Sequence, residues 1–207
     1  MSSTEHTTEY PNGPSVARII RVGGVSKSEL LSKLELTGVR LNNAALALFS
    51  DERFTTSAIG ALIEIVEVSV GSLGLPDGAT FAQIVDQAAE AGLSLCPLEL
   101  GPHFRMQYTD QPEGSLGQRP SLHRAPPGSI TVANAPLADD EETPKGFYLR
   151  RIEGALWLRG YRSWPGHIWS PEDILVFSRP PMRPNPSIER TCSSGLRPLP
   201  HAAHVKR

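Results

Sequence analysis

The sequence predicts an α+β protein in which two or three helices pack on an antiparallel sheet of five or six strands. Two patterns typical of helix starts and several segments that alternate with period two favour this class. A C-terminal stretch without periodicity favours a disordered tail after the domain. We expect one domain over residues 16–178, a disordered arm at 1–15 and a disordered Pro/Arg-rich tail at 179–207. Within the domain, residues 26–50 would form a helical hairpin and residues 60–178 the sheet plus one helix.

A short strand and two short helices are expected at the start of the domain. Arg18–Val22 fits the strand, and Ser26-Lys27-Ser28-Glu29 has the form of a capping box. In such a box the Ser oxygen and the Glu carboxylate each satisfy an unpaired backbone N–H. Gly38 lies where this helix would end. A second short helix follows, capped by Asn42 or Asn43.

A longer strand and a third helix come next. Residues 63–70 alternate with period two, but the phase slips between Ile65 and Val66. A bulge there would keep both apolar sets on one face of the strand. Another capping-box pattern at residues 80–83 begins a helix that Gly92 closes. The side chains expected to face inward from this helix are Phe81, Ile84, Val85 and Ala88.

The remainder of the domain is expected to be rich in strands. Strands are predicted at Phe104–Tyr108, Ser129–Asn134 and Ile174–Phe177, and the last of these would close the sheet. A mobile loop rich in Pro, Gly, Ser and Arg is expected at residues 115–128, and a solvated acidic loop at residues 139–142.

The clearest hairpin joins residues 147–152 to residues 155–161 through the two-residue loop Glu153-Gly154. This loop places Arg150 opposite Trp157. One face of the hairpin is apolar and suits the core; it comprises Phe147, Leu149, Leu156 and Leu158. The opposite face, which we call the aromatic/Arg face, carries Tyr148, Arg150, Trp157, Arg159 and Tyr161.

Three interpretations of the aromatic/Arg face remain open. In the first, the rings stack a base or an aromatic metabolite while the guanidiniums hold a phosphate or a carboxylate. In the second, Arg150 stacks on Trp157 as ordinary stabilisation of the sheet. In the third, the helices cover this face.

A second candidate site lies where Tyr108, Asp110 and Glu113 cluster. Two carboxylates beside a tyrosine suit acid–base catalysis, whereas Asp and Glu around Pro-Gly are also common in plain turns. Cys96 is expected to be a buried structural thiol, because it adjoins apolar residues and lacks a nearby cation. His167 is expected to be a packed or partly exposed histidine.

Several function classes are disfavoured by missing patterns. The Walker-type, dinucleotide-binding, hydrolase and zinc-protease motifs do not occur in the sequence. No cofactor and no metal site are expected. His201 and His204 lack a third ligand for zinc, and the acidic loop lacks the glycine of a calcium loop.

The charge distribution and the N-terminus indicate the cellular location and the classes of partner to expect. Residues 1–100 carry 12 acidic and 6 basic side chains, whereas the tail at 179–207 carries 6 basic side chains and one acid. The N-terminus has no apolar segment typical of a signal peptide, so we expect the cytoplasm. No membrane partner is expected, and the acidic surroundings of the aromatic/Arg face disfavour a long nucleic acid. A small molecule or another protein remains as the partner.

These observations favour a non-enzymatic ligand-binding or protein-interaction module. One alternative is a small enzyme with its carboxylate/Tyr site near residues 108–113. Another is a weak binder of single-stranded nucleic acid through the aromatic/Arg face.

Several segments carry a resemblance. Gly74-Leu-Pro-Asp-Gly-Ala-Thr, Leu93-Ser-Leu-Cys-Pro-Leu-Glu-Leu-Gly-Pro, Arg105-Met-Gln-Tyr-Thr-Asp-Gln-Pro-Glu-Gly, Gly146-Phe-Tyr-Leu-Arg-Arg and Leu156-Trp-Leu-Arg-Gly-Tyr resemble a family of uncharacterised bacterial proteins. The resemblance covers residues 22–178. Some members of that family carry a "helicase" label, which the missing nucleotide-binding motifs of this sequence do not support.

The tail carries a separate resemblance. Residues 183–200, which read Arg-Pro-Asn-Pro-Ser-Ile-Glu-Arg-Thr-Cys-Ser-Ser-Gly-Leu-Arg-Pro-Leu-Pro, resemble a translated recombination-site repeat of an integron gene cassette. This resemblance implies an accessory protein of mobile-cassette origin, with a tail that owes nothing to selection on the protein.

Overall fold

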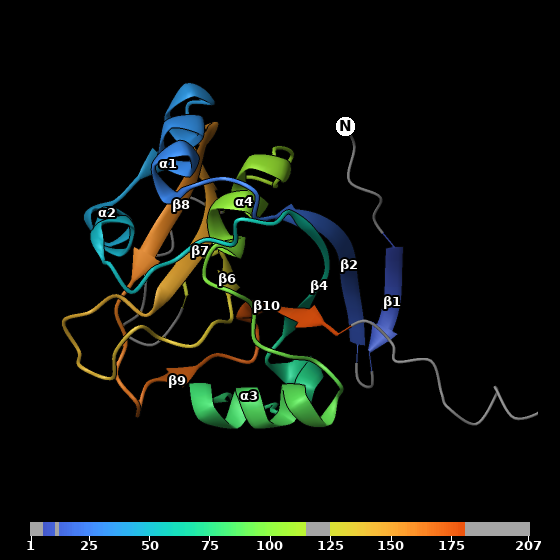
Figure 1. Ribbon diagram of the computed structural model, residues 1–207. Coiled ribbons are helices and arrows are strands. Elements are labelled where there is room, and N and C mark those ends of the chain that lie inside the picture. The colour runs from blue at the N-terminus through green and yellow to red at the C-terminus, as the bar shows by residue number, and fades with distance from the viewer. Residues whose placement is uncertain (1–5, 11–12, 115–124, 181–207) are drawn as a thin grey trace, which may run out of the picture.

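The computed structural model describes residues 6–10, 13–114 and 125–180, and the side chains from Ser15 onward within these ranges. Within these ranges the chain forms an α+β fold, which is the predicted class, but with four α-helices in place of the two or three expected (Figure 1). The helices are α1 (Lys27–Leu36), α2 (Asn43–Ser50), α3 (Phe81–Glu90) and α4 (Leu100–Gln107), with a short 3-10 turn η1 (Gly71–Leu73).

The main sheet is larger and less uniform than expected. Its eight strands lie in the order β1-β2-β4-β10-β6-β7-β8-β3. Most neighbours are antiparallel, but β10 runs parallel to β6 and β3 runs parallel to β8. The strands are β1 (His6–Tyr10), β2 (Gly13–Val22), β3 (Arg40–Leu41), β4 (Ala61–Ser69), β6 (Ile130–Val132), β7 (Gly146–Ile152), β8 (Ala155–Tyr161) and β10 (Ile174–Arg179). A two-stranded sheet pairs β5 (Ala79–Thr80) with β9 (Ile168–Trp169).

Two hydrophobic cores lie on opposite faces of the main sheet. The first is filled from α1, α2 and α4, and the second from α3. In Figure 1 these three helices lie on one side of the strands and α3 lies on the other, beside β9. The central strand β10 serves both cores, because Val176 belongs to the first while Leu175 and Phe177 belong to the second. The strand expected to close the sheet therefore lies inside it, between β4 and β6.

The same two-sided burial explains the phase slip in β4. Ile65 and Val66 are both completely buried, the first in the α1/α2/α4 core and the second in the α3 core. The register against β2 is continuous here, with Ala17 opposite Val66 and Arg18 opposite Ile65. The bulge expected between these two residues is therefore wrong. The apolar positions change phase because the covered face of the strand changes.

Both capping boxes are confirmed. Ser26 caps α1 and Thr80 caps α3, each with its reciprocal bond from the third helical residue. Asn42 caps α2 by accepting from the Ala45 N–H at 2.9 Å. The two helices of the expected hairpin are joined through β3, whose residues pair with β8 at the edge of the sheet.

The strand predicted at Phe104–Tyr108 is wrong, because these residues belong to the end of α4 and its C-cap. Leu100, Phe104 and Tyr108 are spaced four apart and are all buried in the first core, which is the helical period. Pro102 lies in the first turn, where its missing N–H costs no helical hydrogen bond.

The N-terminal arm is also partly ordered. His6–Tyr10, expected to be disordered, forms β1 and pairs antiparallel with β2. The outer edge of β2 offers unpaired backbone groups to which such a segment can add. Residues 115–124 of the expected mobile loop, and the tail beyond Pro180, lie outside the described residues. Within the described ranges, no helix is both long enough and apolar enough to cross a membrane.

Candidate functional site

The hairpin that carries the aromatic/Arg face has the predicted register. Arg150 lies opposite Trp157 and Tyr148 lies opposite Arg159. The loop residues Glu153 and Gly154 have φ angles of 51° and 75°, as a two-residue hairpin loop requires. The helices that contact this hairpin, α2 and α4, lie on its apolar face and do not cover the aromatic/Arg face.

The short strand β3 adds an arginine to this face that the sequence did not indicate. Arg40 pairs with Trp157 on the side opposite to Arg150. The guanidinium carbons over the Trp157 ring are those of Arg159 at 5.1 Å and Arg40 at 5.8 Å from its centroid. Among the described residues, the stacking on Trp157 that was considered for Arg150 is therefore made by Arg40 and Arg159. We call Arg40, Arg150, Trp157 and Arg159 the arginine cluster.

Three N–H groups of the arginine cluster are buried without a hydrogen-bond acceptor in the described structure: Arg150 Nε, Arg159 Nε and Trp157 Nε1. Tyr148, beside the cluster, is also buried, and burial raises the pKa of its hydroxyl while Arg159 and Arg150 oppose that shift. The cluster is thus rich in donors and poor in acceptors.

Tyr161, the last residue of the predicted face, belongs to a different site. Its ring packs against the second core and meets Trp169 edge-to-face, with centroids 5.7 Å apart. There it forms one wall of a cavity of about 170 Å³, which we call the aromatic pocket. The residues lining the pocket are Phe81, Asn134, Pro136, Asp139, Lys145, Tyr161, Ser163, Trp164, Pro165 and Trp169.

The aromatic pocket takes its shape from local structure in four segments. The Thr80 cap starts α3 so that Phe81, its first residue, lies 6.4 Å from Trp169 between ring centroids. Gly78 precedes this cap with a φ of 79°, and a Cβ on it would come within 2.3 Å of the Trp169 carbonyl oxygen. The pairing of β5 with β9 therefore requires glycine at this position.

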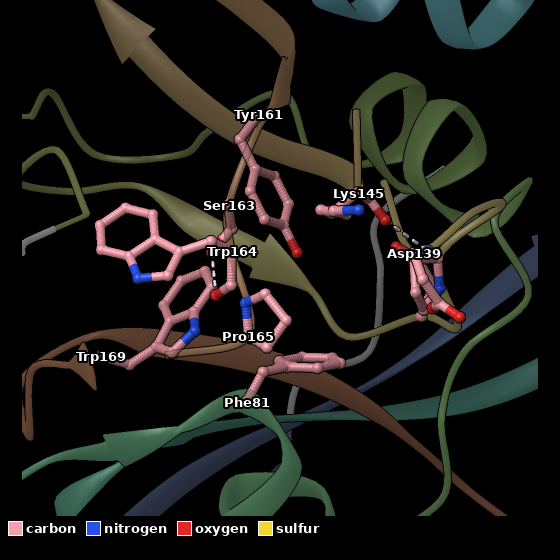
Figure 2. A pocket seen from close by; sticks show the side chains of 10 residues that line it. Phe81, Asp139, Lys145, Tyr161, Ser163, Trp164, Pro165 and Trp169 are labelled. Carbon is pink, nitrogen blue, oxygen red and sulfur yellow. Dashed lines mark hydrogen bonds between the residues drawn. The ribbon is translucent and has the colours of Figure 1, made fainter. Parts of the chain in front are cut away.

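The pocket wall also includes a polar stretch. Asn134 is buried and donates to the carbonyls of Ala135 and Lys145, both at 2.9 Å, whereas its Oδ1 has no donor within the described residues. The Lys145 ammonium donates to the Ala138 and Asp140 carbonyls. Figure 2 shows the polar side of the pocket, where Lys145 and Asp139 lie across from Trp164 and Trp169.

The Tyr161 hydroxyl points into the space between Lys145, Pro165 and Phe81 (Figure 2). Burial raises the pKa of this hydroxyl. The phenol is therefore neutral near pH 7 and keeps its proton available as a donor. A ligand in the pocket would meet flat apolar walls, a neutral phenol and the buried side chain of Asn134.

The three residues of the second predicted site have different surroundings in the fold. Tyr108 is buried and stacks on Phe104 at 5.4 Å, with the Arg18 guanidinium 4.1 Å from its centroid. Asp110 is exposed. Glu113 accepts from the N–H of Gly154 at 3.1 Å, in the turn of the hairpin. The acid–base role proposed for these residues stays a prediction.

Two other polar residues lie where their sequence context predicts. Cys96 is buried with its thiol 3.5 Å from the Val176 carbonyl, and burial raises the pKa of the thiol. His167 packs edge-on against Trp164 and Trp169, beside the aromatic pocket. His201 and His204 lie outside the described residues. Within the described ranges, no group of three or more His, Cys, Asp or Glu residues is placed to hold a metal ion.

Of the residues that line the aromatic pocket, the sequence analysis named only Tyr161 as a candidate binding residue, and assigned it to the aromatic/Arg face. The other lining residues come from segments that lie far apart along the chain. The period-two alternation within one strand cannot predict that such segments meet. The one local signal was the crowding of Trp164, His167 and Trp169 within six residues around Pro165. Comparison of the chain with protein-family models, curated proteins and solved structures finds no match.

Proposed function

We propose that this protein is a non-enzymatic binding module for a small molecule, and that the ligand occupies the aromatic pocket. The observation that carries the proposal is a cavity of about 170 Å³ walled by the rings of Phe81, Tyr161, Trp164 and Trp169. Ligand sites are typically concave and apolar, with a few polar groups that orient the ligand. The buried Oδ1 of Asn134 and the hydroxyl of Tyr161 are such groups.

The size of the pocket restricts the ligand to one ring or a branched group of similar volume. An engineered apolar cavity of about 150 Å³ in another protein takes up benzene. The tilted and edge-to-face arrangement of the wall rings suits a flat ring. The buried amide oxygen suits a donor on that ring, because a buried acceptor left without a partner costs about 1–3 kcal/mol. A ring that carries a hydroxyl or an amine satisfies both conditions.

Binding is tested by titrating the full chain with phenol, aniline and toluene and following tryptophan fluorescence and the melting temperature. Replacing Trp157, outside the pocket, by Phe leaves Trp164 and Trp169 as the reporters. We expect phenol and aniline to bind more tightly than toluene. The absence of saturable binding by any of the three probes would refute the pocket as a site for such molecules.

Two substitutions localise the site. Ser163→Phe places a ring in the pocket and should abolish binding while the chain remains folded. Tyr161→Phe removes one hydroxyl and should lower the affinity for phenol more than the affinity for toluene. Tyr148→Phe is the matched control, because it makes the same change in the same hairpin outside the pocket.

The other functions favoured by the sequence have weaker support. The enzymatic alternative relies on Asp110 and Glu113, which the fold leaves at the surface. The nucleic-acid alternative needs an open row of rings, but Tyr148 is buried and Tyr161 belongs to the pocket.

A further inference from the structure

We propose that the arginine cluster is a second binding site, separate from the aromatic pocket, for an oxyanion: a phosphate or carboxylate group carried by a small molecule. The proposal does not depend on what the aromatic pocket binds, because the two sites share no residue.

The first argument is the crowding of like charges. Arg40 and Arg150 flank Trp157 on the two neighbouring strands, and Arg159 lies two residues further along the same strand. Arg159 is thus the diagonal neighbour of both Arg40 and Arg150. Diagonal neighbours on one face of a sheet are about 7–8 Å apart, within reach of long side chains, and like charges at such distances repel. Two of the three guanidiniums also lie within 6 Å of one indole ring. A bound anion would relieve this repulsion.

The second argument is the missing counter-ion. The ion pairs among the described residues join other arginines, such as Arg53 with Asp51 and Arg179 with Glu64. Glu113, the carboxylate at the nearby hairpin turn, lies 3.6 Å from Arg151 and accepts from Gly154. Within the described ranges, no carboxylate is placed to pair with the arginine cluster.

The third argument is the chemistry of the unpaired groups. Arg150 Nε, Arg159 Nε and Trp157 Nε1 are all donors, and all three are buried without an acceptor. Guanidinium and indole groups offer no acceptor of their own. Their natural partner is therefore a group with several acceptor oxygens and a negative charge. Arginine forks bind carboxylates and phosphates in this way, through parallel N–H···O bonds.

The site can be tested on the unaltered chain by nuclear magnetic resonance. The Nε–H signals of Arg150 and Arg159 and the indole N–H signal of Trp157 are followed during titration with sodium phosphate and, separately, with sodium acetate. Sodium chloride keeps the ionic strength constant. Arg53 and Arg179 serve as internal controls, because each already has a carboxylate partner.

We expect saturable shifts at the three cluster signals and none at the two controls. Saturation with phosphate alone identifies a phosphate group, and saturation with acetate identifies a carboxylate. Unchanged cluster signals with both salts, or equal shifts at Arg53 and Arg179, would overturn the proposal.

Substitutions then separate the charge from the shape of the guanidinium. Arg159→Gln should weaken the affinity for the oxyanion about tenfold or more, since a hydrogen bond to a charged group is lost. Arg159→Lys keeps the charge but loses the planar fork, and its affinity for the oxyanion should lie between those of the wild-type chain and Arg159→Gln. Arg53→Gln should leave the affinity unchanged. Equal affinity in the wild-type, Arg159→Gln and Arg53→Gln chains would place the anion elsewhere.

Discussion

A buried polar network at the end of α4 offers the sharpest test of how the fold is stabilised. Arg105 is completely buried in α4, and its guanidinium donates to the Tyr108 carbonyl and to Gln111 Oε1. Gln111 is 1% exposed and donates in turn to the carbonyls of Gly128 at 3.0 Å and Leu149 at 3.3 Å. This one amide therefore joins α4, β7 and the segment before β6.

We predict that Gln111→Leu lowers the free energy of unfolding by about 3–5 kcal/mol. Removing an acceptor from a buried charged donor costs roughly 1.5–3 kcal/mol, and the two carbonyls lose their shared donor as well. Arg105 is completely buried, so its charge is poorly solvated, and this burial lowers the pKa of the guanidinium to about 10. Little water is therefore available to replace the lost amide.

The assay is urea denaturation of the full chain, with Gln107→Leu as the matched control. Gln107 makes a similar set of bonds, to both backbone groups of Arg21 and to the His103 carbonyl, but at the surface. We expect the control to cost about 1 kcal/mol or less. The double variant Arg105→Met/Gln111→Leu should recover part of the loss, because the buried charge is removed with its partner. Equal losses for the two glutamine variants would refute the reasoning.

Three further predictions concern single residues. With Cys192 replaced by Ser, a thiol reagent should react with Cys96 only as fast as the chain unfolds, because the thiol is buried out of reach of the reagent and burial also raises its pKa. Rapid labelling of the native chain would contradict this. His103 accepts from the Gly23 N–H at 3.0 Å, and burial, assisted by Lys33, lowers its pKa below 6.5. The stability that neutral His103 contributes is therefore complete above pH 6.5 and is lost as the pH falls through 6.5 towards the lower pKa of the folded state. Acidification should therefore lower the melting temperature of the wild-type chain more than that of His103→Gln. Gly146→Ala would bring a Cβ within 2.2 Å of Asn134 Oδ1; the displaced amide should cost about 1–3 kcal/mol in urea and weaken binding in the aromatic pocket, and unchanged binding would separate Asn134 from the ligand.

Much of the local structure could be predicted because its causes lie within a few residues. The capping boxes at Ser26 and Thr80 close through side chains three residues apart. The register of the β7–β8 hairpin follows from the two-residue loop at Glu153-Gly154, and with it the faces on which Arg150, Trp157 and Arg159 lie. Each of these decisions is made by sterics and hydrogen bonds that the neighbouring residues supply.

The errors arose where burial depends on distant segments. The phase change at Ile65 and Val66 looked like a bulge because a single strand does not show that helices cover both of its faces. The segment from Phe104 to Tyr108 alternates well enough for a strand, but its role as a helix end is set by packing against β2 and β7. In both segments the tertiary environment overrode a local pattern.

The sequence by itself determined the α+β class, the helix starts and the hairpin that presents the arginines, because short-range hydrogen bonds and periodicity specify them. Only the tertiary structure decided the two candidate sites. Arg40 reaches Trp157 through the parallel pairing of β3 with β8. The aromatic pocket brings Phe81, Asn134, Tyr161 and Trp169 together from separate segments. Such contacts depend on how a sheet and its helices close in space, which no spacing along the chain encodes.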